Sequence, residues 1–384
     1  MSFISELTSD LDQLKTTGRF RELREIVPMG EGRCRWKGKE FWNLSSNDTL
    51  GLAGNAELRR SFYAQFDQGS PELTLTSASS RLLTGNTLAY NRLESRLSEM
   101  YASRAALVFN SGYHANIGIL PALTTGKDMI LSDKLNHASI IDGMKLSDAD
   151  TFRYRHLDFE HLEKLLTDNR ANYRRAFIVT ESVFSMDGDC VDLRRLIELK
   201  EKYDCLLMVD EAHTVGVRGP QGAGLCMELG VLEKVDILLG TFGKAFASTG
   251  AYAIVAHEVK DYLINHARPF IFTTGLPPAV LNWSAFALKQ VARMDAEREK
   301  IKRMGLRLRT LVQEKGQGTT IAGESQIVPL IVGEDTAAVE LAESFQEKGF
   351  LVFAIRPPTV PQGTSRLRFS LTAALDETIL EQML

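Results

Sequence analysis

The chain has 384 residues, of which 44% are hydrophobic and 24% are charged, and its formal net charge is −4. A chain of this length is expected to form a large domain and a smaller one rather than a single small core. The slight acidic excess argues against a nucleic-acid surface, which usually needs a basic excess. The four cysteines form no C-x-x-C pair, so we expect reduced thiols, as in cytoplasmic proteins, and neither a zinc site nor a disulfide framework.

The N-terminal residues show no targeting segment. The first seven residues lack a basic region followed by an apolar stretch, and no apolar run approaches the roughly 20 residues that a membrane span needs. We therefore expect a cytoplasmic protein with no membrane partner. The first 25 residues have helical spacing, with an apolar stripe made of Ile4, Leu7, Leu11 and Leu14. A strand-like stretch follows over residues 27–44, and we assign residues 1–50 to an N-terminal helix and strand segment.

Between residues 51 and 285, apolar runs alternate with amphipathic segments. The runs are Ala106–Phe109, Met129–Leu131, Ala176–Val179, Leu206–Val209, Val235–Leu239 and Ala251–Val255. Runs that are apolar on both faces suit the strands of a parallel sheet covered by helices. A helical pattern at Asp192–Tyr203 lies between two of them. Residues 51–285 are therefore predicted to form a large α/β domain with a mainly parallel central sheet flanked by helices.

Residues 286–384 have a different pattern. A long charged helix is predicted near Val291–Lys315. Strands are predicted at Gln326–Val332 and Leu351–Ile355, with a helix at Thr336–Lys348 between them. This region is predicted to be a smaller C-terminal α+β domain.

Polar groups follow three of the predicted strands. Thr180–Asp189 follows the third apolar run, Asp210 follows the fourth, and Gly240–Lys244 follows the fifth. Because ligands in open α/β sheets bind outside the carboxyl ends of the strands, we expect these groups on one rim. Asp210 and Lys244 are 34 residues apart, about one βαβ unit, so their strands are expected to be neighbours.

Three residues on this rim suit a flat aromatic aldehyde. A carboxylate such as Asp210 is costly to bury unless a cation meets it, and a protonated pyridine nitrogen would be one; a helix N-cap is the other interpretation. His213 could bond a phenolic oxygen, or be an ordinary loop histidine. Lys244 lies among small and apolar residues, where desolvation favours the neutral amine that forms an imine, although most lysines are surface groups.

Other residues suit a phosphate or a ring, each weakly by itself. Ser111–Gly112 forms a Ser-Gly turn that enters a predicted helix, where backbone N–H groups could bind phosphate. The hydroxyl of Thr241, three residues before Lys244, could join them. His137 follows the second apolar run and could stack on a flat ring. It is the combination with the rim residues that indicates a cofactor site.

Asp210–His213 also spells D-E-A-H, an ATP-binding motif of helicases. A helicase also needs the phosphate loop G-x-x-x-x-G-K-[ST]. None of the three Gly-Lys pairs, at Gly38, Gly126 and Gly243, is followed by Ser or Thr. The sequence therefore argues against a nucleotide motor.

Over nearly its whole length the chain resembles the α-oxoamine synthases, which are fold-type I transferases that depend on pyridoxal 5′-phosphate (PLP) and join an amino acid to an acyl thioester. The resemblance is carried by Ser45–Asp48, Ser80–Asn86, Ser185–Asp189, Val209–His213, Thr241–Phe246 and Phe272–Thr274. It implies PLP as the cofactor, no metal, and a homodimer.

Within this family, residues 325–333 and 354–368 resemble the members that condense L-alanine with pimeloyl-CoA or pimeloyl-carrier protein in biotin biosynthesis. Two alternatives remain open. One is a relative such as glycine C-acetyltransferase, and the other is a non-catalytic PLP-binding protein.

The resemblance also implies roles for single residues at the cofactor. Lys244 would bind PLP as a Schiff base and act as the base, Asp210 would pair with the pyridine nitrogen, and His137 would stack on the ring and contact the substrate. The remaining cofactor contacts would come from Gly112, Tyr113, Ser185, His213, Thr241, Thr273 and Thr274. Of these, His213 and Ser185 would lie near the phenolic oxygen, and the last two would reach the phosphate of the partner subunit.

On the substrate side, the resemblance implies that Arg368 binds the amino-acid carboxylate with Asn47 nearby, and that Arg21 and Thr359 contribute. Some positions depart from the family pattern. Thr49 replaces a tyrosine and Tyr90 replaces a common histidine, and both changes bear on the acyl substrate rather than on PLP.

Overall fold

The structure is a computed structural model that describes residues 2–67, 69–316, 319–321 and 323–383. The chain forms two compact units. Unit 1 comprises Met1–Asn55, Met186–Asp189 and Glu299–Leu384, and unit 2 comprises Ala56–Ser185 and Cys190–Arg298.

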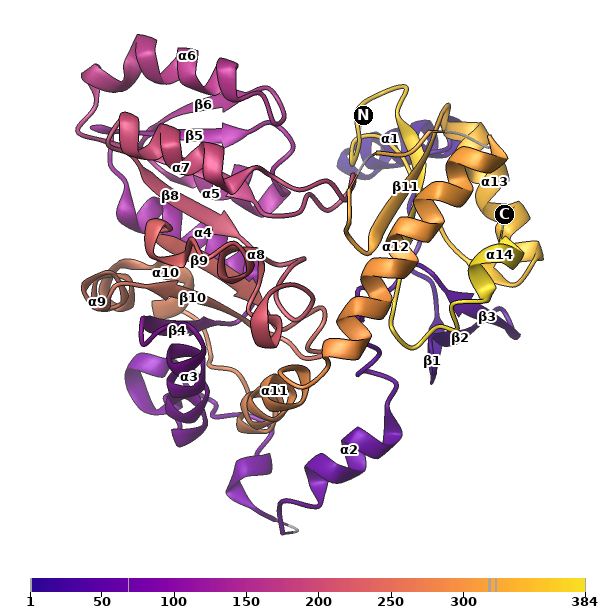
Figure 1. The fold of residues 1–384 in the computed structure, drawn as a ribbon, viewed down its shortest axis with the longest axis horizontal. Helices are drawn as coiled ribbons and strands as arrows, with labels where there is room; N and C mark the ends of the chain where they lie inside the picture. Colours follow the sequence, from indigo (N-terminus) through magenta and orange to yellow (C-terminus); the bar gives the residue numbers. More distant parts are fainter. Residues whose placement is uncertain (1, 68, 317–318, 322, 384) are drawn as a thin grey trace. The chain divides into compact units, whose positions relative to one another are not determined.

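Unit 2 is built on a seven-stranded sheet with the order β4-β10-β9-β8-β7-β5-β6 (Figure 1). Its strands are β4 (Ala105–Phe109), β5 (Asp128–Asp133), β6 (Asp150–Tyr154), β7 (Arg175–Glu181), β8 (Leu206–Asp210), β9 (Ile237–Thr241) and β10 (Ala251–Val255). The five strands from β9 to β6 run parallel. The prediction of a mainly parallel sheet is therefore confirmed.

Two strands of this sheet differ from the prediction. Ala251–Val255 was expected among the parallel strands, but β10 runs antiparallel to both of its neighbours, β4 and β9. The edge strand β6 was not predicted. Its sequence, Asp150–Tyr154, is half polar and mostly solvent-exposed, so it lacks the apolar run that marks the buried strands.

Helices α4, α5, α9 and α10 cover one face of this sheet. Alternate strand residues such as Leu107 and Phe109 of β4 point to that face and form one cluster with Ile119 of α4, Ile140 of α5 and Leu263 of α9. Removing this apolar surface from water stabilises the sheet by roughly 25 cal/mol per Å².

The helices of unit 2 are α2 (Ala56–Tyr63), α3 (Leu88–Met100), α4 (Gly112–Leu123), α5 (Ala138–Leu146), α6 (Phe159–Asn169), α7 (Leu193–Lys202), α8 (Leu225–Glu228), α9 (His257–His266), α10 (Arg268–Ile271) and α11 (Pro278–Val291). Shorter helical turns span Pro71–Leu73, Arg81–Gly85, Arg170–Asn172, Pro220–Gly222 and Leu232–Lys234. The predicted helix Asp192–Tyr203 is confirmed as α7.

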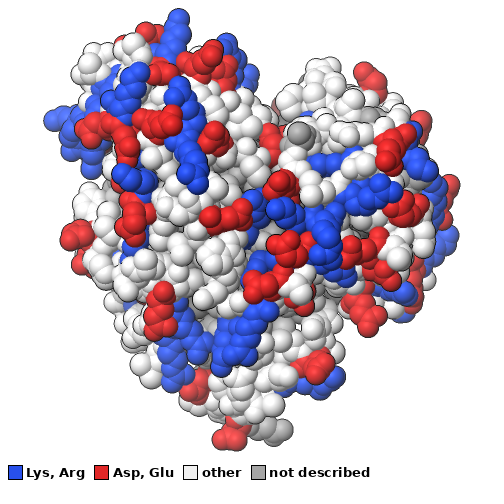
Figure 2. Space-filling model, viewed as in Figure 1, with Lys and Arg blue, Asp and Glu red and all other residues white. Residues whose placement is uncertain are grey.

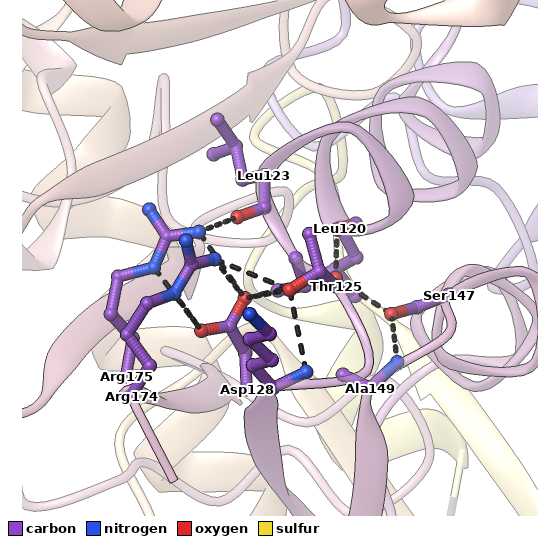
Figure 3. Close-up of polar contacts among 10 residues, drawn as sticks. Leu120, Leu123, Thr125, Asp128, Ser147, Ala149, Arg174 and Arg175 are labelled. Carbon is purple, nitrogen blue, oxygen red and sulfur yellow. Dashed lines mark hydrogen bonds and ion pairs between the residues drawn. The ribbon is translucent and has the colours of Figure 1, made fainter.

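A buried carboxylate fixes the start of β5 (Figure 3). The side chain of Asp128 has no exposed surface. It accepts hydrogen bonds from Arg174 at 2.7 and 3.0 Å and from Arg175 at 3.2 and 3.3 Å. The backbone N–H and the hydroxyl of Thr125 also donate hydrogen bonds to the Asp128 carboxylate. Although burial alone raises the pKa of a carboxyl, these donors hold the pKa of Asp128 well below its ordinary value.

Unit 1 contains two small sheets. One has the order β1-β2-β3-β12, with β1 (Ile26–Gly30), β2 (Arg33–Trp36), β3 (Lys39–Asn43) and β12 (Phe350–Leu351). The other has the antiparallel order β11-β14-β13, with β11 (Ile327–Gly333), β14 (Ser365–Ser370) and β13 (Ala354–Ile355). The single strand predicted at Leu351–Ile355 is wrong in detail, because β12 pairs with β3 whereas β13 pairs with β14.

The other elements of unit 1 are helical. They are α1 (Phe3–Thr16), α13 (Asp335–Glu347), α14 (Ile379–Met383) and most of α12 (Asp295–Lys315), which begins in unit 2. The helices predicted at 291–315 and at 336–348 are present, whereas the helix predicted over the first 25 residues ends at Thr16. None of the residues of α1 is buried, and the leucines of its apolar stripe are 41–46% exposed.

Lysine and arginine side chains are interspersed with aspartate and glutamate on the face drawn in Figure 2, as the nearly balanced composition predicts. Among the described residues, none of the helices combines the length and the apolar character that a membrane span requires.

Candidate active site

The carboxyl ends of β7, β8 and β9 meet at one edge of the sheet in unit 2 (Figure 1). These strands are parallel neighbours, with Glu181 opposite Asp210 and Asp210 opposite Leu239. Lys244 follows three residues after the end of β9. The prediction that the strands before Asp210 and Lys244 are neighbours is confirmed.

Asp210, the last residue of β8, is a buried carboxylate held by neutral donors. Its exposed fraction is 9%. Oδ2 accepts a hydrogen bond from the side-chain amide of Asn116 at 2.9 Å, and Oδ1 accepts one from the backbone N–H of Ala212 at 3.0 Å. No regular helix begins after this turn, so Asp210 does not act as the helix N-cap considered above. A carboxylate held in this way suits a cationic nitrogen of a bound group.

The amine of Lys244 and the imidazole of His213 are in hydrogen-bond contact. Nζ of Lys244 lies 2.7 Å from Nε2 of His213, which is 6% exposed. An ammonium and an imidazolium are both donors only, so a hydrogen bond at this distance requires one of the two nitrogens to be neutral. Ser185 lies in the turn after β7 and is half-buried.

The turn that carries Lys244 is held by Thr241 and Gly250. The Thr241 hydroxyl donates to the Gly250 carbonyl at 3.1 Å and accepts from the N–H of Gly243 at 3.1 Å. Phe242 and Phe246, two residues before and after Lys244, are fully buried, so the backbone of Lys244 lies in an apolar turn. The Thr241 hydroxyl already donates one hydrogen bond and accepts another within the turn. To donate to a phosphate it would have to give up its hydrogen bond to the Gly250 carbonyl.

His137 is the N-cap of α5. Its Nδ1 accepts from the backbone N–H of Ser139 at 3.2 Å and lies 2.7 Å from the Ser139 hydroxyl. Its own backbone N–H donates to Oε1 of Glu181 at 2.6 Å. The ring of this exposed residue is thus fixed at its Nδ1 edge. Desolvation lowers the pKa of His137, and the Lys244 charge acts in the same direction.

The N-terminus of α4 offers room and backbone donors for an anion. Ser111 caps this helix by accepting from the N–H of His114 at 3.1 Å. A side chain added at Gly112 would meet nothing within 4 Å, so the space at the first turn is open. Tyr113 is 45% exposed, and its hydroxyl donates to Asp142. A helix N-terminus of this kind binds phosphate through its N–H groups and dipole.

Thr273 and Thr274 lie beside the start of the same helix. Nδ2 of Asn110, the residue after β4, donates to the carbonyl of Thr274 at 2.8 Å and contacts the Thr273 hydroxyl at 3.4 Å. Thr274 is exposed and Thr273 is half-buried, so both hydroxyls remain accessible. Their predicted contact with a phosphate of the partner subunit stays a prediction.

Unit 1 brings four of the five predicted substrate residues together in two pairs. The guanidinium of Arg368 lies 3.3 and 3.4 Å from the side-chain oxygen of Asn47. Arg21 donates to the Thr359 hydroxyl at 3.0 Å. Arg366, two residues before Arg368 in β14 and therefore on the same face of the strand, is buried and forms an ion pair with Asp187.

Sequence reasoning missed three buried polar residues of unit 2, which are Glu181, Asn116 and Ser139. Burial first, and then the Asp210 carboxylate, raises the pKa of Glu181 to about 8. Glu181 ends β7 just as Asp210 ends β8, so the same strand-end rule could have found it. Asn116 is a polar residue on the buried face of α4, which was also a usable signal. Within the described part of the chain, no group of three or more His, Cys, Asp or Glu could hold a metal ion.

A comparison with family models matches residues 39–384 to the model described as aminotransferase class I and II. An 8-amino-7-oxononanoate synthase from Chlorobaculum parvum is 50% identical over 377 residues, which cover 98% of this chain and 96% of that protein. A putative 8-amino-7-oxononanoate synthase from Pasteurella multocida is 46% identical and covers 97% and 96% of the two chains.

Solved structures agree with the sequence relatives. A serine palmitoyltransferase from S. paucimobilis, solved with a bound PLP–myriocin aldimine, superposes with a TM-score of 0.90 at 25% identity and covers 100% of this chain and 96% of its own. An 8-amino-7-oxononanoate synthase from Francisella tularensis superposes with a TM-score of 0.76 at 28% identity and covers 89% and 95%.

Proposed function

The chain belongs to the aminotransferase class I and II family and is a PLP-dependent acyltransferase of biotin biosynthesis, and we propose that it condenses L-alanine with a pimeloyl thioester. The products would be 8-amino-7-oxononanoate, CO₂ and the free thiol. The observation that carries this proposal is the meeting of Asp210, His213 and Lys244 at the ends of two adjacent strands, in a chain that is 50% identical to a synthase of that name.

The residues at this edge fit PLP. The donors that bind the buried Asp210 carboxylate in the described part of the chain are neutral, which suits a protonated pyridine nitrogen. The Lys244 amine suits the aldehyde, and the open first turn of α4 at Gly112 suits the phosphate. When bound, PLP supplies an electron sink for the carbanion that forms at the amino-acid Cα.

The protein's own groups then move the protons and orient the substrate. The Lys244 amine is the group that takes the Cα proton of alanine and returns a proton to the product. His213, 2.7 Å from that amine, holds it by a hydrogen bond in which one nitrogen stays neutral. Arg368 would bind the alanine carboxylate through its guanidinium fork, with Asn47 holding the fork in place.

A product assay tests the proposal. The purified protein with PLP is incubated with L-alanine and either pimeloyl-CoA or a pimeloyl-carrier protein, and the product is identified by mass. We expect 8-amino-7-oxononanoate from at least one donor, with Lys244→Ala as the inactive control. Product from glycine and acetyl-CoA, but none from alanine, would instead identify a glycine C-acetyltransferase. The absence of any product with PLP bound would identify a non-catalytic binding protein.

The proposal also includes a cytoplasmic homodimer, in which Thr273 and Thr274 of one subunit reach the phosphate bound by the other. Sedimentation analysis of the PLP-loaded protein tests the dimer. A monomer that is fully active would contradict the shared phosphate site.

A further inference from the structure

Asn116 and Ser139 connect Asp210 to His137 through a continuous row of hydrogen bonds. Nδ2 of Asn116 lies 2.9 Å from Oδ2 of Asp210 and 3.0 Å from Oγ of Ser139. Oγ of Ser139 lies 2.7 Å from Nδ1 of His137. Asn116 and Ser139 are each 1% exposed, so bulk water does not replace these partners.

The Asp210 carboxylate determines which atom of the Asn116 amide faces it. An ionised carboxylate only accepts, so the amide of Asn116 must present its NH₂ group to it. That NH₂ group has two N–H bonds, and the second points to Oγ of Ser139. The buried Oδ1 of Asn116 has no hydrogen-bond partner among the described residues. The Asn116 side chain therefore acts through its two N–H donors, and its oxygen is not used.

Ser139 contacts Nδ1 of His137 through both its hydroxyl and its backbone N–H. Oγ of Ser139 accepts from Asn116, and among the described residues the one acceptor within reach of its buried O–H is Nδ1 of His137, so the O–H donates there. The backbone N–H of Ser139 donates to the same Nδ1 at 3.2 Å. Two donors at Nδ1 leave no room for a proton there, so a neutral ring carries its proton on Nε2.

The surroundings of His137 favour a neutral ring. As the N-cap of α5, it lies at the positive end of that helix, which disfavours an imidazolium. Lys244 opposes a second positive charge, whereas Asp210 and Asp142 favour one. Glu181 contacts the backbone N–H of His137 and not its ring. Desolvation is the largest influence, and the net effect is a lowered pKa.

We propose that Asn116 and Ser139 are positioning residues that hold His137 as the Nε2–H tautomer, so that the ring offers a fixed hydrogen-bond donor to the bound ligand and not a base. The consequence for the reaction rests on the proposed function: with His137 unable to accept a proton at Nε2, Lys244 is the group that moves the Cα proton of the amino acid.

Nitrogen NMR tests the tautomer directly. PLP-loaded protein with ¹⁵N-labelled histidine gives long-range ¹H–¹⁵N spectra that distinguish protonated from unprotonated ring nitrogens, and His137→Gln assigns the signals. In the wild type we expect an unprotonated Nδ1 and a protonated Nε2. Asn116→Leu changes no atom bonded to His137, but it removes the N–H donor that competes with a proton on Nδ1 for Oγ of Ser139, so we expect the Nδ1–H form to become populated.

Ser139→Ala is the second variant. It removes the hydroxyl that opposes a proton on Nδ1, so we expect the pKa of His137 to rise by roughly one unit, and Ser139→Thr to restore it. The matched control is Ser284→Ala, which removes an equally buried helix hydroxyl bonded to Val280 and Ser248. His137 should not respond to it.

Two results would overturn the inference. One is a wild-type spectrum with the proton on Nδ1, and the other is an Asn116→Leu spectrum in which His137 is as unchanged as in Ser284→Ala. Neither readout uses substrate. A protein that makes product with the wrong tautomer therefore contradicts this inference alone, and one with the expected tautomer but no product contradicts the proposed function alone.

Discussion

Nζ of Lys244 lies 2.7 Å from Nε2 of His213, although the two residues come from the turns after different strands. The contact depends on the parallel pairing of β8 and β9, which sets the two turns side by side. It places the Lys244 amine beside the His213 imidazole in the turns that follow β8 and β9, and β8 ends in the buried carboxylate of Asp210. The chemistry proposed for the chain depends on this arrangement.

Asp210→Asn should retain PLP but slow the removal of the alanine Cα proton. The amide is neutral, so it no longer stabilises a protonated pyridine nitrogen, and the electron sink weakens. We expect deuterium exchange at Cα, measured by NMR in D₂O without an acyl donor, to fall about 100-fold or more. Asp192→Asn, at the N-cap of α7, is the matched control and should exchange normally. An unchanged rate in Asp210→Asn would contradict the assignment.

Arg368→Lys should weaken alanine binding without affecting PLP. Lysine has the charge but not the planar fork that binds a carboxylate at two points. Losing one charged hydrogen bond corresponds to a rise in the KM for alanine of roughly 10-fold to 100-fold, while PLP absorbance is retained. Arg303→Lys, which changes an exposed arginine paired with Glu377, is the control. If the KM for alanine of Arg368→Lys equals that of Arg303→Lys, Arg368 does not bind the alanine carboxylate.

The strand-end rule predicted that Asp210, His213 and Lys244 lie at one edge of the sheet, because each lies at or within a few residues of the end of a buried strand and parallel strands bring such positions together. It could not reveal that Asn116 and Ser139 are hydrogen-bonded to each other and, through Asn116, to Asp210. These two residues lie in helices α4 and α5, and only the packing of one helix against the other brings their side chains within 3.0 Å.

Local pattern also could not assign strands to sheets. The run from Leu351 to Ile355 is continuous in the sequence, yet its two ends pair with β3 and β14 in different sheets. Likewise, alternation places Arg366 and Arg368 on one face of β14, but it could not reveal that the buried Arg366 forms an ion pair with Asp187, which is distant in sequence. Such long-range partners are set by tertiary packing and not by the period of the pattern.

Asp128→Asn should destabilise the protein at neutral pH by about 1–3 kcal/mol, because the two arginines lose a buried anionic partner. The folded-state pKa of Asp128 is lowered, so its contribution is present above the unfolded pKa near 4 and is lost as the pH falls toward the folded value. The difference in urea midpoint between wild type and variant should therefore shrink below about pH 4. Asp12→Asn, which alters an exposed pair with Lys15, should have little effect. A difference that does not change with pH would contradict the charge-based account.

Glu211→Gln should change how stability depends on pH. Burial is the main cause that raises the pKa of Glu211 to about 7, and its Oε2 has no hydrogen-bond partner among the described residues. A raised folded-state pKa means that stability is fully present below the unfolded pKa, near 4.3, and is lost as the pH rises through 7.

The glutamine stays neutral, so its urea midpoint should fall less between pH 5 and pH 8 than that of the wild type. The difference is on the order of 1–3 kcal/mol. Glu181 is present in both proteins, so comparing the two curves isolates Glu211. Parallel curves would show that Glu211 does not bind a proton in the folded protein.

The position of the covalent PLP tests the central claim most directly. The PLP-loaded protein is reduced with borohydride and digested, and the peptide that carries the added cofactor mass is sequenced. We predict that the modification lies on Lys244 and that Lys244→Ala yields no modified peptide, while Lys234→Ala, at an exposed lysine, is labelled like the wild type. Recovery of the cofactor on any other lysine of the wild-type protein would contradict the account.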